Sequence, residues 1–185
     1  MVKNVLAESE NKMKKTIDAL QMDLRAIRTG RASPALLERI RVEYYGTSTG
    51  LIELASVSAP EPHQLLIRPW DVSAVKDIER AILQSDLGLT PSNDGKVIRL
   101  MIPPLTEDRR KELTKIVSKR VEEARVGVRN CRRDALSELK DMEKDKAIPE
   151  DDFYVAKDDL QKLTDDYIAE VEKVGKAKEE EILEI

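Results

Sequence analysis

The sequence predicts an α+β protein of two domains, in which an elongated antiparallel three-helix bundle carries a small inserted β/α/β domain. Two observations predict this class. Apolar residues recur with the helical period in one N-terminal and two C-terminal segments. Between these segments, short runs of β-branched residues alternate with glycine and proline. Charged residues make up 37% of the 185 positions and aromatic residues only 3%, which favours long exposed helices over a large compact core.

The longest helix is predicted over residues 105–146. Thr106 is its expected N-cap, and the acidic residues Glu107 and Asp108 follow in the first turn, where they oppose the helix dipole. Apolar residues then recur at steps of three and four, as in a coiled-coil seam. The seam consists of Leu113, Val117, Val121, Ala124, Val128, Cys131, Ala135, Leu139 and Met142.

Two further helices are predicted to pack against this one. The first covers residues 1–28 and is expected to end at Thr29 and Gly30, where glycine can take the left-handed cap conformation. The third begins after Pro149 and continues to Ile182. Because each helix has an apolar seam that only the other two can bury, the three should form one elongated bundle.

Residues 31–104 predict the inserted domain. A run at 40–45 reads as a strand, residues 46–50 as a turn or loop, and Ser73 as the N-cap of a helix over 74–83. Asn93-Asp94-Gly95 is a strong hairpin-turn signal. Further strands are expected at 54–59, 65–67 and 97–102. The bundle therefore comprises 1–30 and 105–185, and a hinge is expected at 30–34 and 102–105.

The long helix also carries a local excess of positive charge. Residues 109–133 hold ten basic and three acidic side chains, although the formal net charge of the chain is −4. Set against Val128 at zero, four arginines fall at roughly 40° to 140° around the helix, beside the seam. These residues, here called the arginine stripe, are Arg125, Arg129, Arg132 and Arg133.

The arginine stripe predicts contact with the backbone of folded RNA, because arginine suits bidentate phosphate recognition. Arg28 and Arg31, near the end of the first helix, are further candidates. The alternative is pairing with the third helix, since residues 147–185 hold thirteen acidic and five basic side chains. In that case the protein would be a helical adaptor or chaperone-like module that binds proteins without RNA.

Other candidate sites are weaker. His63 is the only histidine and has no nucleophile placed near it, and Cys131 occupies a seam position, so both favour structural roles. Three acidic pairs recur every seven residues from Asp151, which indicates a solvated helix face more than a metal site. Trp70 is expected in the core or between domains. No catalytic residue, metal or cofactor is predicted.

The single cysteine excludes an internal disulfide, the N-terminus is too polar for a signal peptide, and no apolar run is long enough for a membrane span. A cytoplasmic location follows as the expectation.

Several stretches together resemble the bacterial ribosome recycling factor family, in order and over essentially the whole chain. They are residues 27–34, 42–46, 85–89, 93–95 with 98–99, 103–110, 128–134 and 161–165. Two departures are small. Residues 47–50 replace a loop that usually carries prolines, and Cys131 stands where an aliphatic residue is usual.

The resemblance implies an L-shaped, tRNA-like monomer that performs no covalent chemistry. It implies binding to the post-termination ribosome through large-subunit ribosomal RNA, and subunit separation driven by elongation factor G and its GTP hydrolysis. DNA and membranes are not expected partners. The family's principal RNA-contacting arginines match Arg129 and Arg132, with Arg133, Arg28 and Arg31 as neighbours. Its hinge residues match Gly30, Arg31, Pro103 and Pro104.

Overall fold

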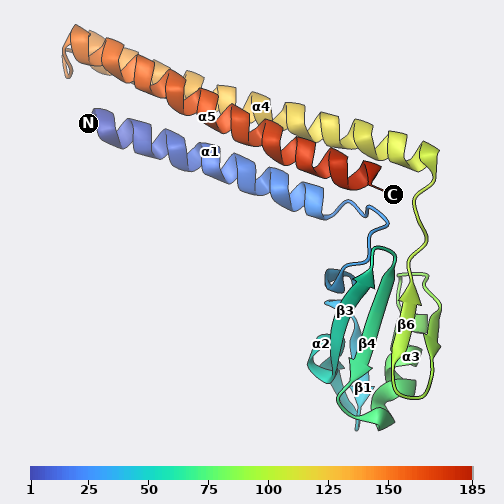
Figure 1. Ribbon diagram of the computed structural model, residues 1–185. Helices are drawn as coiled ribbons and strands as arrows, with labels where there is room; N and C mark the ends of the chain where they lie inside the picture. The colour runs from blue at the N-terminus through green and yellow to red at the C-terminus, as the bar shows by residue number, and fades with distance from the viewer. Residues whose placement is uncertain (185) are drawn as a thin grey trace. The chain divides into compact units, whose positions relative to one another are not determined.

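The computed structural model describes residues 1–184 and divides into two compact units (Figure 1). The helical unit comprises Met1–Arg28 and the chain from Thr106 onward, and the β unit comprises Thr29–Leu105. The combination of a long helical bundle with a small sheet-containing unit confirms the predicted α+β class. Residue 185, which the predicted bundle segment 105–185 includes, lies outside the described residues.

Three helices run side by side in the helical unit (Figure 1). They are α1 (Val2–Arg25), α4 (Glu107–Lys144) and α5 (Glu150–Leu183). At 1.5 Å per residue, α4 is about 57 Å long. No helix within residues 1–184 combines the length and apolarity needed to cross a membrane.

The predicted seam of α4 faces the other two helices. Leu113, Val117, Val128 and Leu139 are among its buried residues, while Cys131 is half-buried. Polar contacts add specific pairings between the helices. The Ser9 hydroxyl donates to the carbonyl of Cys131 at 3.4 Å. Burial of this periodic apolar face stabilises the bundle more than helix propensity does.

Both ends of α4 have defined caps. The Thr106 hydroxyl accepts a hydrogen bond from the backbone N–H of Arg109 at 3.2 Å, which confirms the predicted N-cap. At the other end, the N–H of Lys146 donates to Glu143 and the N–H of Ala147 donates to Met142. This pair of bonds is a Schellman motif, with Lys146 at φ +56° in the position that glycine usually takes.

Helix α1 ends earlier than predicted. It ends at Arg25 with Ala26 as its C-cap, so the expected end at residue 28 and the cap at Gly30 are wrong. The N–H of Ile27 bonds to the carbonyl of Leu24, a tightened last turn. The apolar period continues through Ile27 because that side chain still packs partly against the protein, even though its backbone has left the helix.

The β unit contains a two-stranded and a four-stranded antiparallel sheet. Its strands are β1 (Arg41–Tyr44), β2 (Thr47–Gly50), β3 (Ala55–Glu61), β4 (Gln64–Pro69), β5 (Pro91–Asn93) and β6 (Ile98–Met101). The larger sheet has the order β3-β4-β6-β5. Its helices are η1 (Pro34–Leu37), α2 (Leu51–Leu54), η2 (Val72–Ala74) and α3 (Val75–Gln84). Buried side chains such as Leu65, Ile78 and Ile98 form one core beneath them.

Residues 47–50 form a strand, so the predicted loop over 46–50 is wrong beyond its first residue. Thr47–Gly50 pairs in antiparallel register with Arg41–Tyr44. Tyr45 and Gly46 connect the strands with φ values of +49° and +76°. Positive φ at both central residues is typical of the turn that matches the twist of a hairpin. The polar composition of β2 reflects its exposure, because backbone pairing does not require apolar side chains.

Asp71, and not Ser73, caps the start of the helical segment after β4. Its carboxylate accepts hydrogen bonds from the N–H of Ser73 at 2.9 Å and from the hydroxyl of Tyr44 at 2.7 Å. The bond to Asp71 raises the pKa of Tyr44 to about 12, and donation from Tyr44 lowers the pKa of Asp71. Beside this cap, Trp70 is 73% exposed, so the expectation of core packing is wrong.

The entry and exit segments of the β unit meet at the turn between β3 and β4. The N–H of Ala32 donates to Pro62 at 2.6 Å, and the N–H of Ile102 donates to His63 at 2.8 Å. Nδ1 of His63 lies 2.9 Å from the carbonyl of Gly30. Because a carbonyl only accepts, Nδ1 carries the proton in this bond. His63 therefore has a structural partner.

Candidate nucleic-acid interface

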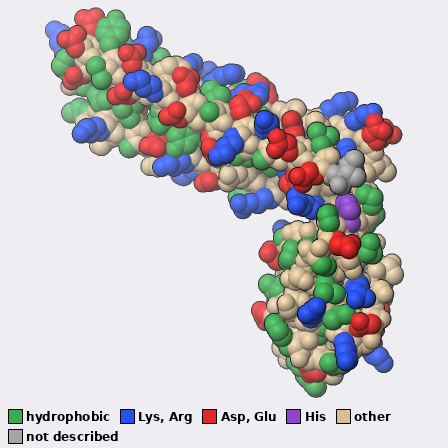
Figure 2. Space-filling view, in the orientation of Figure 1, with side chains coloured by type: hydrophobic (Ala, Val, Ile, Leu, Met, Phe, Trp, Pro, Cys, Tyr) green, Lys and Arg blue, Asp and Glu red, His purple; other side chains and the backbone are tan. Residues whose placement is uncertain are grey.

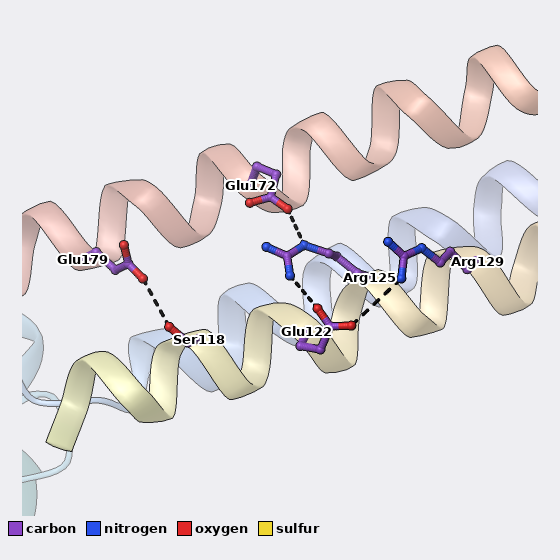
Figure 3. Close-up of polar contacts among 6 residues, drawn as sticks. All are labelled: Ser118, Glu122, Arg125, Arg129, Glu172 and Glu179. Atoms are coloured by element: carbon purple, nitrogen blue, oxygen red, sulfur yellow. Dashed lines mark hydrogen bonds and ion pairs between the residues drawn. The ribbon is translucent and has the colours of Figure 1, made fainter. Parts of the chain in front are cut away.

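Two residues of the arginine stripe contact α5: Arg125 bonds to Glu172 (Figure 3), and Arg132 bonds to Gln161. The two helices are antiparallel here. Ser118 bonds to Glu179, Arg125 to Glu172, and Arg132 to Gln161, so the partner's number falls as the position in α4 rises. This register decides which arginine meets a carboxylate and which does not.

Arg125 is bound by two carboxylates. Its Nε donates to Glu172 of α5 and its Nη1 donates to Glu122, one turn earlier in α4 (Figure 3). Two hydrogen bonds raise the pKa of Arg125, the one to Glu172 more than the one to Glu122. The bond from Arg125 in turn lowers the pKa of Glu172. The Arg125 side chain is only 28% exposed. Its charge is therefore compensated within the bundle, as the pairing alternative expects.

Arg129 and Arg133 point into solvent. Arg129 is 52% exposed, and its Nη1 lies 3.9 Å from the second oxygen of Glu122 (Figure 3). Arg133 is 75% exposed and lies 4.0 Å from its neighbour Asp134. Exposed ion pairs at such distances contribute about 0–1 kcal/mol, so both guanidinium groups can exchange these partners for a phosphate at little cost.

Arg132 has a neutral partner. Its Nη1 donates to the side-chain carbonyl of Gln161 at 2.9 Å. The amide nitrogen of Gln161 donates in turn to Asp165 at 2.9 Å. Arg132 is half-buried, and this short chain of bonds fixes its head group at the edge of the α4–α5 interface.

The remaining predicted arginines belong to different units. Arg28 is exposed in the helical unit, shortly after the end of α1. Arg31 is exposed in the β unit. The predicted RNA-binding set thus contains five residues of the helical unit and one of the β unit.

The surface around the arginine stripe carries both signs of charge. Figure 2 shows basic and acidic side chains interspersed along the helical unit. Next to the Arg125–Glu172 pair, an open groove of about 630 Å³ lies between α4 and α5, with Val121 and Gly175 among its lining residues. Basic and acidic side chains both line it, which distinguishes the groove from a dedicated anion site.

The other sequence candidates have structural surroundings. Burial raises the pKa of the Cys131 thiol, which favours the protonated, unreactive form. Asp165, from the third acidic pair, holds Gln161. Within residues 1–184, no three His, Cys, Asp or Glu side chains are grouped so that they could hold a metal ion.

Sequence reasoning missed the residues that surround the arginines. Glu122, Glu172 and Gln161 decide how far the charge of each neighbouring arginine is compensated, yet none of the three is a candidate from the sequence. Glu122 could have been found from its spacing of three before Arg125. Glu172 and Gln161 lie far away in sequence, and only the register of α5 against α4 brings them to the site.

The fold and the site define an α+β protein built on a charged three-helix bundle, and comparisons with known proteins give its family. The ribosome recycling factor family profile matches residues 20–183. Ribosome-recycling factors of Shouchella clausii and Carboxydothermus hydrogenoformans are 56% and 54% identical to the chain, and each alignment covers 100% of both proteins.

Solved structures agree. A solution structure of a ribosome recycling factor has 44% identity and a TM-score of 0.75, and the match covers 100% of this chain and 98% of that one. The second, with 45% identity, a TM-score of 0.64 and 100% coverage of both chains, represents the Thermus thermophilus factor in models with Escherichia coli elongation factor G bound to the E. coli post-termination complex. The chain belongs to the ribosome recycling factor family. It is a non-enzymatic translation factor that acts in ribosome recycling.

Proposed function

We propose that the protein binds the post-termination ribosome by placing α4 on large-subunit ribosomal RNA, and that elongation factor G then separates the subunits at the expense of GTP. The observation that carries the RNA contact is the state of the arginine stripe. Arg125 is neutralised by two carboxylates, whereas Arg129, Arg132 and Arg133 present guanidinium groups with weak or neutral partners. In this proposal Arg125 joins α4 to α5 through its bond to Glu172 and does not contact RNA.

The chemistry of these three side chains suits phosphate. A guanidinium group has five N–H donors in a fixed plane and can bond two phosphate oxygens at once. One rigid helix spaces the three groups, so they can meet successive phosphates without a large ordering cost. The 45% identical factor with elongation factor G on a post-termination complex supports the same partners for this chain.

Salt dependence and subunit splitting test the proposal together. If the three arginines each displace a counterion, the logarithm of affinity for ribosomes should fall with the logarithm of salt concentration, with a slope of about −2 to −3. Subunits should separate only when the protein, elongation factor G and GTP are all present. If the affinity for ribosomes did not change with salt concentration, the proposed RNA contact would be wrong. If the protein did not sediment with ribosomes at low salt, the adaptor alternative would be favoured.

We also propose that the two units move relative to each other, with the chain bending at the ends of the predicted hinge. Two chain crossings join the units, one after Arg28 and one before Thr106. Gly30 itself is held in the β unit, because its carbonyl bonds to His63. Bending therefore belongs to residues 26–29 and 103–106, between the β unit and the ends of α1 and α4.

Small-angle scattering of the free protein tests the hinge. The curve should require a range of arrangements of two rigid units. A curve fitted equally well by one fixed arrangement at all temperatures would contradict the proposal.

A further inference from the structure

Gln161 meets Arg132 with an uncharged group at a position where α5 could have supplied a carboxylate. We propose that Gln161 is a positioning residue, which holds Arg132 ready for an RNA phosphate without neutralising its charge. This inference rests on the proposed function, because it concerns how the same arginine meets the same partner.

The hydrogen bonds fix the orientation of the amide. Arg132 can only donate, so the atom of Gln161 that faces it at 2.9 Å is the carbonyl oxygen. Ionised Asp165 can only accept, so the atom that faces it at 2.9 Å is the amide nitrogen. Both neighbours require the same orientation. Asp165 thus prevents Gln161 from turning over and presenting a donor to Arg132.

Arg125 shows the effect of a carboxylate partner from α5 in place of an amide. It lies two turns earlier on the same shoulder of α4, and there α5 provides Glu172. Together with Glu122, that carboxylate compensates the charge of Arg125 and leaves its side chain only 28% exposed. An amide accepts the same kind of hydrogen bond without a compensating charge. Helix α5 therefore meets Arg125, which joins the two helices, with the carboxylate of Glu172, and meets Arg132, the proposed RNA contact, with the amide of Gln161.

Positioning matters because a free arginine side chain loses much rotamer freedom when it binds. The bond to Gln161 uses one of the five N–H donors of Arg132 and restricts the side chain before RNA arrives. Preorganisation of this kind raises affinity by reducing the ordering cost of the complex. The gain requires that the positive charge remain available, which the amide ensures.

Two substitutions separate charge from position. Gln161→Glu places a carboxylate beside the guanidinium group. It should weaken binding to purified bacterial ribosomes roughly tenfold and make the salt slope shallower by about 1. Gln161→Met keeps the length of the side chain but removes both hydrogen bonds. It should weaken binding a few-fold while the salt slope stays unchanged, because the charge of Arg132 remains.

Gln21→Glu is the matched control, since it makes the same charge change on α1 of the same bundle. It should bind as the wild type does, and circular dichroism should show the same thermal unfolding for all variants. Arg132→Ala separates the two hypotheses. If Arg132→Ala weakens binding but Gln161→Met binds normally, Gln161 is not a positioning residue. If Arg132→Ala itself binds normally, the proposed RNA contact fails.

Discussion

Replacing Arg132 with glutamate is expected to weaken ribosome binding at least a hundredfold and to abolish subunit splitting at ordinary factor concentrations. A hydrogen bond between charged groups contributes about 1.5–3 kcal/mol, and the new carboxylate adds repulsion from the phosphate. A combined loss of about 3–4 kcal/mol corresponds to two to three orders of magnitude in affinity. Co-sedimentation with ribosomes over a salt series measures this loss directly.

Arg120→Glu provides the control for charge reversal. Arg120 lies on the same helix, is exposed and pairs with Glu123 one turn away at 3.0 Å. On the helical wheel it falls at roughly 280°, on the shoulder opposite the arginine stripe. The two variants carry the same net charge, so a loss seen in both would indicate a general electrostatic effect. Equal, near-normal binding of both would show that the stripe does not contact RNA.

The sequence predicted the long helices well because their signals are local. The seam of α4 repeats over many turns, and the Thr106 cap depends on residues three apart. The end of α1 was misplaced because apolar spacing records which side chains pack, while the helix ends where backbone hydrogen bonds change. Those bonds shift at Ala26 and Ile27, before the apolar period stops.

The β1–β2 hairpin shows a different limit. Its turn contains Tyr45 in a left-handed conformation that residues other than glycine, asparagine and aspartate seldom adopt. Neither that residue nor the polar run that follows signals a strand. The pairing depends on β1, whose alternation predicts a strand, so the sequence indicates one strand of the hairpin and not the other.

The candidate site divides in the same way. The arginine stripe is visible in the sequence because four arginines fall on one shoulder of one helix. Whether each charge remains available depends on α5, and the relevant partners, Glu172 and Gln161, lie 47 and 29 residues away from the arginines they meet. Charge excess can be counted from the sequence, but charge compensation requires the register between helices.

That register depends on a close approach of α4 and α5, and Gly175→Ala is expected to disrupt it. A Cβ atom at residue 175 would lie 2.5 Å from Cγ2 of Val121, well inside van der Waals contact. Val121 is 5% exposed, and a β-branched side chain in a helix has one strongly preferred rotamer, so it cannot turn away. Overpacking of this kind costs typically about 1–3 kcal/mol.

Helix propensity acts in the opposite direction, since alanine in a helix interior is favoured over glycine by about 1 kcal/mol. We expect the clash to exceed this gain, with a net loss of up to about 2 kcal/mol in the free energy of unfolding of the helical unit. At about 2–4 °C per kcal/mol for a chain of this size, Tm should fall by several degrees. Thermal and urea unfolding followed by circular dichroism measure both quantities.

Gly127→Ala is the matched control. A Cβ atom there would meet Cγ2 of Thr16 at 2.9 Å, but Thr16 is only half-buried and its side chain can move toward solvent. Propensity should then prevail, and this variant should be as stable as the wild type or slightly more stable. Adding Val121→Ala to Gly175→Ala should restore part of the lost stability, because the methyl group of one residue occupies the space vacated by the other. If Gly175→Ala proved as stable as Gly127→Ala, the contact between Gly175 and Val121 would not set the spacing of the helices, and the pairing of Arg125 with Glu172 would need another cause.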